Sequence, residues 1–216
     1  MKFCALQLGI ILLVAAVGCS RAADKVAALK VEAEAGDVLA QYELGRIYLD
    51  GDGVAKDSSE GAKWFLMAAE NGDVDAQYYI ALLYDDGDGV EQDDTEAVKW
   101  YLKAAKQGDQ YSQYNLAVMY DEGTGVEEDS AKAMHWFLQA AEQGDVDGQY
   151  NLGTMYENGE AGKVDLVRAY VWFSIAAKNG VPEAKDKVAK IGTQLSAEDF
   201  AKATSRSEEL QQQYGL

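Results

Sequence analysis

The chain of 216 residues contains 37 Asp and Glu against 19 Lys and Arg, which gives a formal net charge of −18. This excess of acid argues against nucleic-acid binding, because neutralising phosphates requires a surface of Lys and Arg, and against electrostatic docking on anionic lipid head groups. Since 48% of the residues are hydrophobic, the chain can bury a substantial core and is not expected to be disordered.

The first predicted element is a targeting segment. Lys2 supplies a positive start, and an apolar run follows over residues 5–17, with Gln7 as its one polar residue. This run is shorter than the ~20 residues that a membrane-spanning helix needs, and it has the length of the apolar region of a signal peptide. The run ends in Ala16-Val17-Gly18-Cys19, which resembles the lipobox of bacterial lipoproteins, where the Cys is acylated and becomes the mature N-terminus.

Two processing schemes fit this segment. In the favoured scheme, residues 1–18 are removed as a signal peptide and Cys19 carries a lipid, which predicts an outer-membrane lipoprotein facing the periplasm. In the other scheme, a plain secretory signal is cut after Ala22 and the protein is soluble in the periplasm or secreted. Both schemes take the chain out of the cytoplasm. Both also remove Cys4, the other of the two cysteines, so no internal disulfide is expected.

After this segment, a 36-residue repeat dominates the sequence. Aromatic and amide residues keep the same place in every copy, as expected of an array of identical structural units. The boundary glycines are Gly36, Gly72, Gly108, Gly144 and Gly180. The matching positions include Gln41, Gln77, Gln113 and Gln149; Tyr42, Tyr78, Tyr114 and Tyr150; Tyr48, Tyr84, Tyr120 and Tyr156; and Trp64, Trp100, Trp136 and Trp172.

Each copy is predicted to form two helices. Asp37 and its equivalents can cap the first helix, which ends at a Gly-x-Gly turn such as residues 51–53. Asp57 and its equivalents begin the second helix, which ends at Asn71-Gly72 and the matching pairs. Two such helices joined by a short turn form an antiparallel hairpin. One hairpin cannot bury its apolar face alone, so neighbouring hairpins must stack.

The predicted fold is therefore all-α, a right-handed α/α solenoid of four helical hairpins with capping helices at both ends. Pro182 suits the first turn of a final helix pair, and Ser196 with Asp199 resembles a capping box. The predicted segments are 19–35 for the anchor Cys, tether and N-terminal cap helix, 36–71, 72–107, 108–143 and 144–179 for the repeats within 36–180, and 181–216 for the C-terminal capping helices.

These residues resemble Sel1-like repeats, which are relatives of the tetratricopeptide repeat. The family pattern is A-x-Y-x-L-G-x-x-Y, then G-x-G-V, then D-x-x-x-A-x-x-W-[FY]-x-x-A-A-x-x-G. The third copy matches it at Tyr114, Leu116, Tyr120, Gly123, Gly125, Val126, Asp129, Trp136, Phe137, Ala140, Ala141 and Gly144. The resemblance implies an α/α solenoid that acts as an adaptor or assembly factor. The fourth copy departs at residues 160–162, so its interhelix loop is expected to be remodelled.

Candidate chemical sites are incomplete. Asp50-Gly-Asp52-Gly53 resembles the start of a calcium loop, but the twelfth position, which should be a carboxylate, is Gly61. The single histidine, His135, occupies a position that we interpret as a tolerant surface site, because its equivalents are Lys63, Lys99 and Val171. A lone His without Cys ligands forms neither a zinc site nor a catalytic triad. We therefore predict no catalytic residue, no metal and no cofactor.

The interhelix loops form a predicted acidic edge, defined as residues 49–60, 85–96, 121–132 and 157–168. These windows hold 19 of the 37 acidic residues. Because stacked loops lie along one side of a solenoid, the edge predicts a partner with a basic surface. Its alternative role is solubility alone.

A binding groove is predicted on the side of the first helices that the helical period turns away from the core. Truncating its central members to Ala is expected to leave stability unchanged. The alternative is that its tyrosines partly pack between adjacent first helices. The predicted groove residues are Tyr42, Tyr78, Tyr79, Leu82, Tyr111, Tyr114, Asn115, Val118 and Tyr150.

The combined interpretation is a non-catalytic scaffold or adaptor of the bacterial cell envelope that binds a protein partner along its concave face, with the membrane reached through the lipid on Cys19 and no nucleic acid involved. One alternative is a structural component of an envelope machine of the secretion or flagellar type. The other is an enzyme acting on peptidoglycan or β-lactams. That enzyme would need a nucleophile or paired acids in one pocket, and the periodic placement of the carboxylates argues against it.

Overall fold

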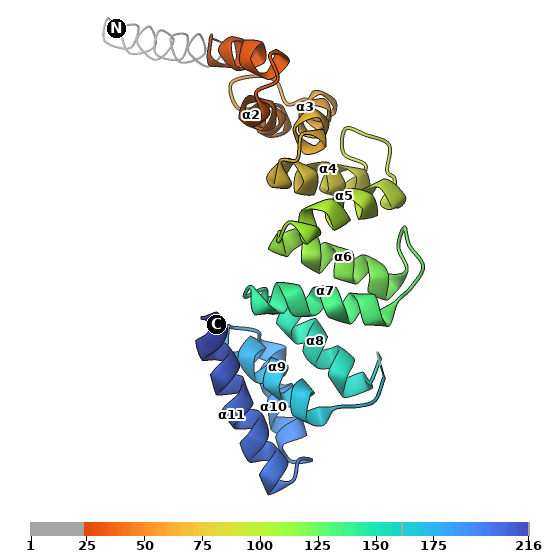
Figure 1. Ribbon diagram of the computed structural model, residues 1–216, viewed down its shortest axis with the longest axis vertical. Helices are drawn as coiled ribbons and strands as arrows, with labels where there is room; N and C mark the ends of the chain where they lie inside the picture. Colours follow the sequence, from red (N-terminus) through yellow and green to blue (C-terminus); the bar gives the residue numbers. More distant parts are fainter. Residues whose placement is uncertain (1–23, 161, 216) are drawn as a thin grey trace, which may run out of the picture. The chain divides into compact units, whose positions relative to one another are not determined.

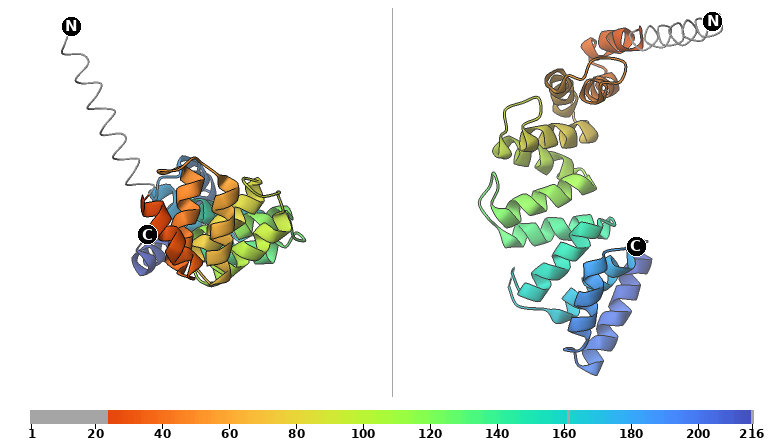
Figure 2. Two further views of the ribbon diagram at one scale, coloured as in Figure 1. Left: turned by 90° about the horizontal axis from the view of Figure 1, so that it is seen from above. Right: turned by 180° about the vertical axis from the view of Figure 1, so that it is seen from behind.

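The computed structural model describes residues 24–160 and 162–215, and all regular structure in these ranges is helical. The predicted signal peptide and Cys19 lie outside the described residues, as does Ala161. Two compact units divide the chain, Met1–Trp100 and Tyr101–Leu216. We call them the N-terminal unit and the C-terminal unit. Figure 1 gives the order of the helices, and Figure 2 shows the same helices from two further directions.

The N-terminal unit begins with a cap helix over residues 24–34. Three complete helices follow, α2 (Val38–Asp50), α3 (Ser58–Glu70) and α4 (Val74–Asp86). Helix α5 (Asp94–Lys106) contains the division between the two units. Within this unit α2 pairs with α3, and α3 packs against α4 of the next repeat.

The C-terminal unit contains two further hairpins and a final helix pair. The hairpins are α6 (Gln110–Glu122) with α7 (Ser130–Glu142), and α8 (Val146–Asn158) with α9 (Leu166–Lys178). The chain ends with α10 (Pro182–Gly192) and α11 (Ala197–Tyr214), which both pack on α9. Tandem helical hairpins that stack on their neighbours in each unit are the α/α-solenoid arrangement, so the predicted fold class is confirmed.

Aspartate caps fix where the helices begin, as predicted. The Asp37 carboxylate accepts a hydrogen bond of 2.8 Å from the Ala40 backbone N–H, and Asp57 does the same for Glu60 at 3.0 Å. An N-cap Asp satisfies one of the unpaired N–H groups of the first turn and favours the positive end of the helix. The same bond recurs at Asp73, Asp93, Asp109, Asp129, Asp145 and Asp165.

The two helices of a hairpin approach closely where a glycine faces an aromatic ring. A Cβ added at Gly45 would lie 2.6 Å from Cδ1 of Phe65, and one at Gly153 would lie 2.9 Å from Cδ1 of Phe173. Phe65 and Phe173 are fully buried. The small residue therefore provides the space that the ring of the second helix fills.

Two details differ from the sequence-based predictions. Val171, interpreted as a surface position, is buried because α11 packs on the outer side of α9. The Ser196 hydroxyl accepts from the Asp199 N–H, as in a capping box, but it also donates to the Asp199 carboxylate at 2.8 Å. That carboxylate is thus bonded to the Ser side chain, whereas in a reciprocal box it would bond the Ser196 backbone N–H.

Candidate protein-binding surface

In the N-terminal unit, two of the predicted groove tyrosines, Tyr42 and Tyr79, contact the ring of Phe65. Tyr79 of α4 stacks on Phe65 with a centroid distance of 4.9 Å and an interplanar angle of 7°. Tyr42 of α2 meets Phe65 at 5.9 Å and Tyr79 at 6.0 Å, and Tyr78 meets Tyr79 edge-on at 5.5 Å. Offset and edge-to-face ring pairs of this kind stabilise a core. Tyr42 and Tyr79 therefore take part in packing, which is the alternative that the sequence left open.

The C-terminal unit repeats the contact between the tyrosine of the first helix and the aromatic ring of the second. Tyr114 meets Phe137 at 5.8 Å, and Tyr150 meets Phe173 at 5.3 Å. Both tyrosines are half-buried, whereas Phe137 and Phe173 are fully buried. Burial raises the pKa of Tyr114, and the carboxylates of Asp147 and Asp145 raise it further. Tyr114 and Tyr150 are thus anchored to the core through their ring contacts.

The position of Tyr79 keeps its role in a later repeat although its chemistry changes. Three repeats on, the equivalent residue is Lys187 of α10, whose ammonium lies 5.5 Å from the centroid of the Phe173 ring. In both repeats this residue covers the aromatic ring of the preceding second helix, first by stacking and then by a cation–π contact. Tyr79 and Lys187 therefore lie in the seam between repeats.

Tyr111 differs from the other predicted groove tyrosines because 61% of its surface is exposed. It stands near the start of α6, and Asn115 and Val118 follow at four and seven residues, which places all three on one face of the helix. Asn115 and Val118 are half-buried, as is Leu82 of α4 in the N-terminal unit. Tyr111, Asn115 and Val118 form what we call the α6 face.

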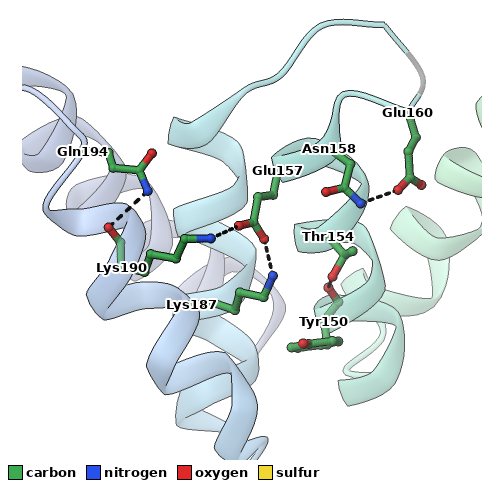
Figure 3. A network of polar contacts seen from close by, with 8 residues as sticks. All are labelled: Tyr150, Thr154, Glu157, Asn158, Glu160, Lys187, Lys190 and Gln194. Atoms are coloured by element: carbon green, nitrogen blue, oxygen red, sulfur yellow. Dashed lines mark hydrogen bonds and ion pairs between the residues drawn. The ribbon is translucent and has the colours of Figure 1, made fainter.

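A salt-bridge network that the sequence did not predict joins α8 and α10 in the C-terminal unit. Figure 3 shows Glu157, at the end of α8, between Lys187 and Lys190 of α10. Burial alone would raise the pKa of the Glu157 carboxyl, but the hydrogen bonds from Lys187 and Lys190 outweigh burial and hold that pKa below its ordinary value. In the repeat, Lys187 and Lys190 are the equivalents of Asn115 and Val118. The corresponding surface of the first helix is therefore polar and apolar on α6 but charged on α10.

A second feature that was not predicted is a set of four equivalent buried glutamines, each of which hydrogen-bonds to the helix before its own. The Gln113 amide donates to the Ala105 carbonyl at 3.2 Å, and its oxygen accepts from the Gln143 amide at 2.7 Å. Gln41, Gln77 and Gln149 donate to the equivalent carbonyls. The four matching glutamines were visible in the sequence as a periodic polar position on the apolar side of a helix, which is the signal of a buried, bonded side chain.

The acidic edge is largely exposed, apart from Glu157. Lys56 and Asp88 lie 4.0 Å apart with 61% and 48% of their side chains exposed, and ion pairs in such positions contribute little to stability. Burial raises the pKa of Asp121, and the carboxylates of Glu160, Glu122 and Glu128 raise it further. The loops of the C-terminal unit therefore hold like charges close enough to repel one another.

Over residues 24–160 and 162–215, no three His, Cys, Asp or Glu side chains converge in a way that could hold a metal ion. None of the helices in this part of the chain has the length and apolar character needed to cross a bilayer.

Comparison with known proteins identifies the repeat. The Sel1 repeat matches residues 38–73, 74–109, 110–145 and 146–181. The chain belongs to the Sel1 repeat family. The matched repeats begin two residues after the boundaries drawn from the glycines, at the first residue of each first helix. Sel1 repeat proteins generally mediate protein–protein interactions and are typically non-catalytic scaffolds.

Two solved structures resemble this Sel1 repeat chain. A protective antigen present in uropathogenic Escherichia coli strains, displaying an SLR fold, shares 32% identity over 85% of this chain with a TM-score of 0.76. A Sel1 repeat protein from Oxalobacter formigenes shares 30% identity with a TM-score of 0.70, and the match covers 80% of this chain and 73% of that protein. The chain spans only 41% of the Escherichia coli protein. Among curated proteins, none matches the sequence.

Proposed function

We propose that this Sel1 repeat chain is a non-catalytic scaffold of the bacterial cell envelope that holds a protein partner on the first-helix side of its C-terminal unit. The observation that carries the proposal is the exposure of Tyr111 on the α6 face, because the other tyrosines at repeated first-helix positions are half-buried against packing rings. A large aromatic side chain left exposed on an interaction scaffold is the type of residue that carries binding energy.

The α6 face has the chemistry of a binding surface. Tyr111 offers a large contact area, a hydroxyl group and few rotamers to lose on binding. Asn115 can donate to and accept from a partner backbone, and Val118 adds apolar contact. The rings of Tyr114 and Tyr150 beside them are held on Phe137 and Phe173, so a partner would meet a pre-organised surface, which reduces the entropy cost of binding.

The acidic edge supports a partner that carries a basic surface. Opposite charges on two proteins speed their encounter, and salt screens this effect. Replacing Asp86, Asp88 and Asp94 together by Asn should slow association and weaken its salt dependence while leaving melting nearly unchanged. An association rate that does not change would assign the edge to solubility.

The envelope location rests on the lipobox-like sequence that ends in Cys19. A lipid on Cys19 would tether the first repeat near the outer membrane on its periplasmic side. Membrane fractionation of cells that express the wild type and Cys19→Ser tests this location. The wild type should sediment with outer membranes and the variant should not, whereas a wild type found only in the soluble periplasmic fraction would contradict the anchor.

The direct test of the binding surface is site-specific photo-crosslinking in cells. A photo-reactive amino acid placed at Tyr111 should capture a defined protein. The matched control is Val31, which is exposed at 69% in the cap helix, outside both the α6 face and the acidic edge. Capture of the same protein at both positions, or of none at Tyr111, would contradict the α6 face as the binding surface.

A further inference from the structure

The first and third repeats differ at the position of Arg46 on their first helices. Helices α2 and α6 have the same length and each begins after a capping Asp, so equivalent residues take equivalent places in their hairpins. One turn before its last residue, α2 carries Arg46 and α6 carries Val118. The groups around Arg46 therefore show what surrounds a cation at this position, and those around Val118 show what remains when the cation is absent.

Arg46 supplies a cation to the tyrosine and the carboxylates beside it in the first repeat. A hydrogen bond between its guanidinium and the Tyr42 hydroxyl is the main cause of its raised pKa, and the guanidinium lies 3.6 Å from the Asp50 carboxylate. Burial, Tyr79 and Asp75 raise the pKa of the Tyr42 hydroxyl, and Arg46 opposes them. The first repeat thus provides its own counter-charge at this place.

The third repeat keeps these acceptors without the cation. Burial, Asp147, Asp145 and Glu122 raise the pKa of the Tyr114 hydroxyl, and no cation is among the groups that act most strongly on it. Asp145 is engaged as the cap of α8, whereas Glu122 and Asp147 are exposed and form no ion pair within residues 24–160 and 162–215. The equivalent groups are Tyr42 and Tyr114, Asp50 and Glu122, and Asp75 and Asp147.

The basic residues of the adjoining helices are engaged elsewhere. Helices α6 and α8 themselves contain no Lys, Arg or His. Lys187 and Lys190 of α10 are both bound to Glu157, and Lys132 of α7 pairs with Asp129 at 3.0 Å. The charge that Arg46 supplies in the first repeat is therefore not replaced by these helices in the third.

Complementary charge favours a cationic side chain from the partner at this place. Asn115 stands where the first repeat has Glu43, so the α6 face has one carboxylate fewer, but the two exposed carboxylates beside Tyr114 remain. Lys106, at the end of α5, is the equivalent of Glu142, which bonds α11 on the second-helix side. The balance of charge on α6 and α8 around Tyr114 is thus negative.

The surroundings suit the long side chain of arginine in particular. Val118 is half-buried and offers apolar contact to an aliphatic stem. Asn151 of α8 hydrogen-bonds the Tyr114 hydroxyl, and a hydroxyl oxygen can accept from a second donor. A guanidinium carries several N–H donors in one plane, so it can bond a carboxylate and a hydroxyl together, as Arg46 does in the first repeat.

We propose that the α6 face takes an arginine of the partner together with an apolar residue beside it, an inference that rests on the α6 face being the binding surface. The guanidinium occupies the place that Arg46 holds in the first repeat, where it pairs with Glu122 and donates to the Tyr114 hydroxyl, and Asp147 adds attraction. The apolar residue covers Tyr111. We call this place the cation site, formed by Tyr114, Val118, Glu122 and Asp147.

Fluorescence anisotropy at physiological ionic strength with two short labelled peptides tests the cation site. Both peptides carry Leu and Phe beside a central residue, which is arginine in the first and citrulline in the second. Citrulline has nearly the shape of arginine but no charge, so the comparison isolates the cation. The protein variants are Glu122→Gln/Asp147→Asn and Val118→Arg in the site, with Glu32→Gln/Glu34→Gln and Val31→Arg on the exposed side of the cap helix as controls of equal charge change.

The arginine peptide should bind the wild type about tenfold more tightly than the citrulline peptide, because it gains a charge-assisted hydrogen bond. Glu122→Gln/Asp147→Asn should abolish this preference. Val118→Arg should abolish it too, since the added guanidinium fills the site as Arg46 does in the first repeat. Both control variants should keep it, with melting temperatures alike. Equal binding of the two peptides to the wild type, binding of neither, or a preference that survives in Glu122→Gln/Asp147→Asn would overturn the proposal.

Tyr111→Ala separates this outcome from that of the proposed function. If the wild type binds both peptides equally and Tyr111→Ala weakens both, the cation site is overturned and the α6 face stands. If the preference for arginine is present and Tyr111→Ala changes neither affinity, the cation site stands and the binding role of Tyr111 fails.

Discussion

The ring of Tyr79 in α4 lies flat against the ring of Phe65 in α3, with centroids 4.9 Å apart and planes 7° apart. This contact joins the second helix of one repeat to the first helix of the next. It places Tyr79 in the seam of the solenoid, although the helical period alone turns its position away from the core. Two tyrosines that the sequence assigns to one groove, Tyr79 and Tyr111, therefore have different roles.

Truncation of these two tyrosines should separate their roles. Tyr79→Ala removes the stacked partner of a fully buried ring, so the free energy of unfolding should fall by about 1–3 kcal/mol. Tyr111→Ala removes a mostly exposed side chain and should change it by less than about 0.5 kcal/mol. Urea unfolding monitored by circular dichroism measures both. Equal losses would mean that Tyr111 is also a packing residue.

The buried glutamines should contribute to the coupling between repeats. Gln113→Met keeps the shape of the side chain but removes its hydrogen bonds to Ala105 and Gln143, at an expected cost of about 1 kcal/mol. The cost is modest because the Ala105 carbonyl also accepts from the Gly108 N–H at 3.0 Å. Gln212→Met on the exposed side of α11 is the control, and a loss as large as that of Gln113→Met would show that the buried bonds contribute nothing.

The network at Glu157 should make stability depend on pH. Since the pKa of this carboxyl is lower in the folded chain than in the unfolded chain, its stabilising effect is complete above the unfolded pKa and is lost as the pH falls through the folded pKa. Glu157→Gln should cost about 1–3 kcal/mol at neutral pH and much less in acid. A cost that stays constant from neutral to acidic pH would contradict the ionic role of Glu157.

Asp121 should show the opposite sign. Its pKa is raised, first by burial and then by Glu160, Glu122 and Glu128, so the charged form is less favourable in the folded state and stability from this group rises as the pH falls through the folded pKa. Asp121→Asn should therefore raise the melting temperature slightly at neutral pH and have no such effect in acid. A lower melting temperature at neutral pH would show that the Asp121 carboxylate makes a favourable contact.

The local features of the fold could be predicted from the sequence because their causes are local. An Asp before a helix, such as Asp37, acts within its own first turn, and the period of Gln41, Tyr42 and Trp64 identifies the repeat directly. The packing of Tyr79 could not be predicted in this way. It depends on a contact with Phe65 of the preceding repeat, and the spacing of residues within one helix gives no information about that contact.

The packing of α11 on α9 was also outside the reach of repeat periodicity. It depends on where a helix without a repeat signature packs, and the sequence carried only one sign of it, the replacement of Lys63, Lys99 and His135 by Val171. The lysines that hold Glu157 were missed for a similar reason. Lys187 and Lys190 lie beyond the last matched repeat, which ends at residue 181, and neither residue type recurs at these positions in the earlier repeats.

The central claim is that a partner binds the α6 face, and titration of the protein captured at Tyr111 tests it most directly. Isothermal titration of that partner against wild type and Tyr111→Ala should give a loss of about 1–3 kcal/mol of binding free energy in the variant, with the same melting temperature for both proteins. An unchanged affinity in a variant that melts like the wild type would contradict the claim.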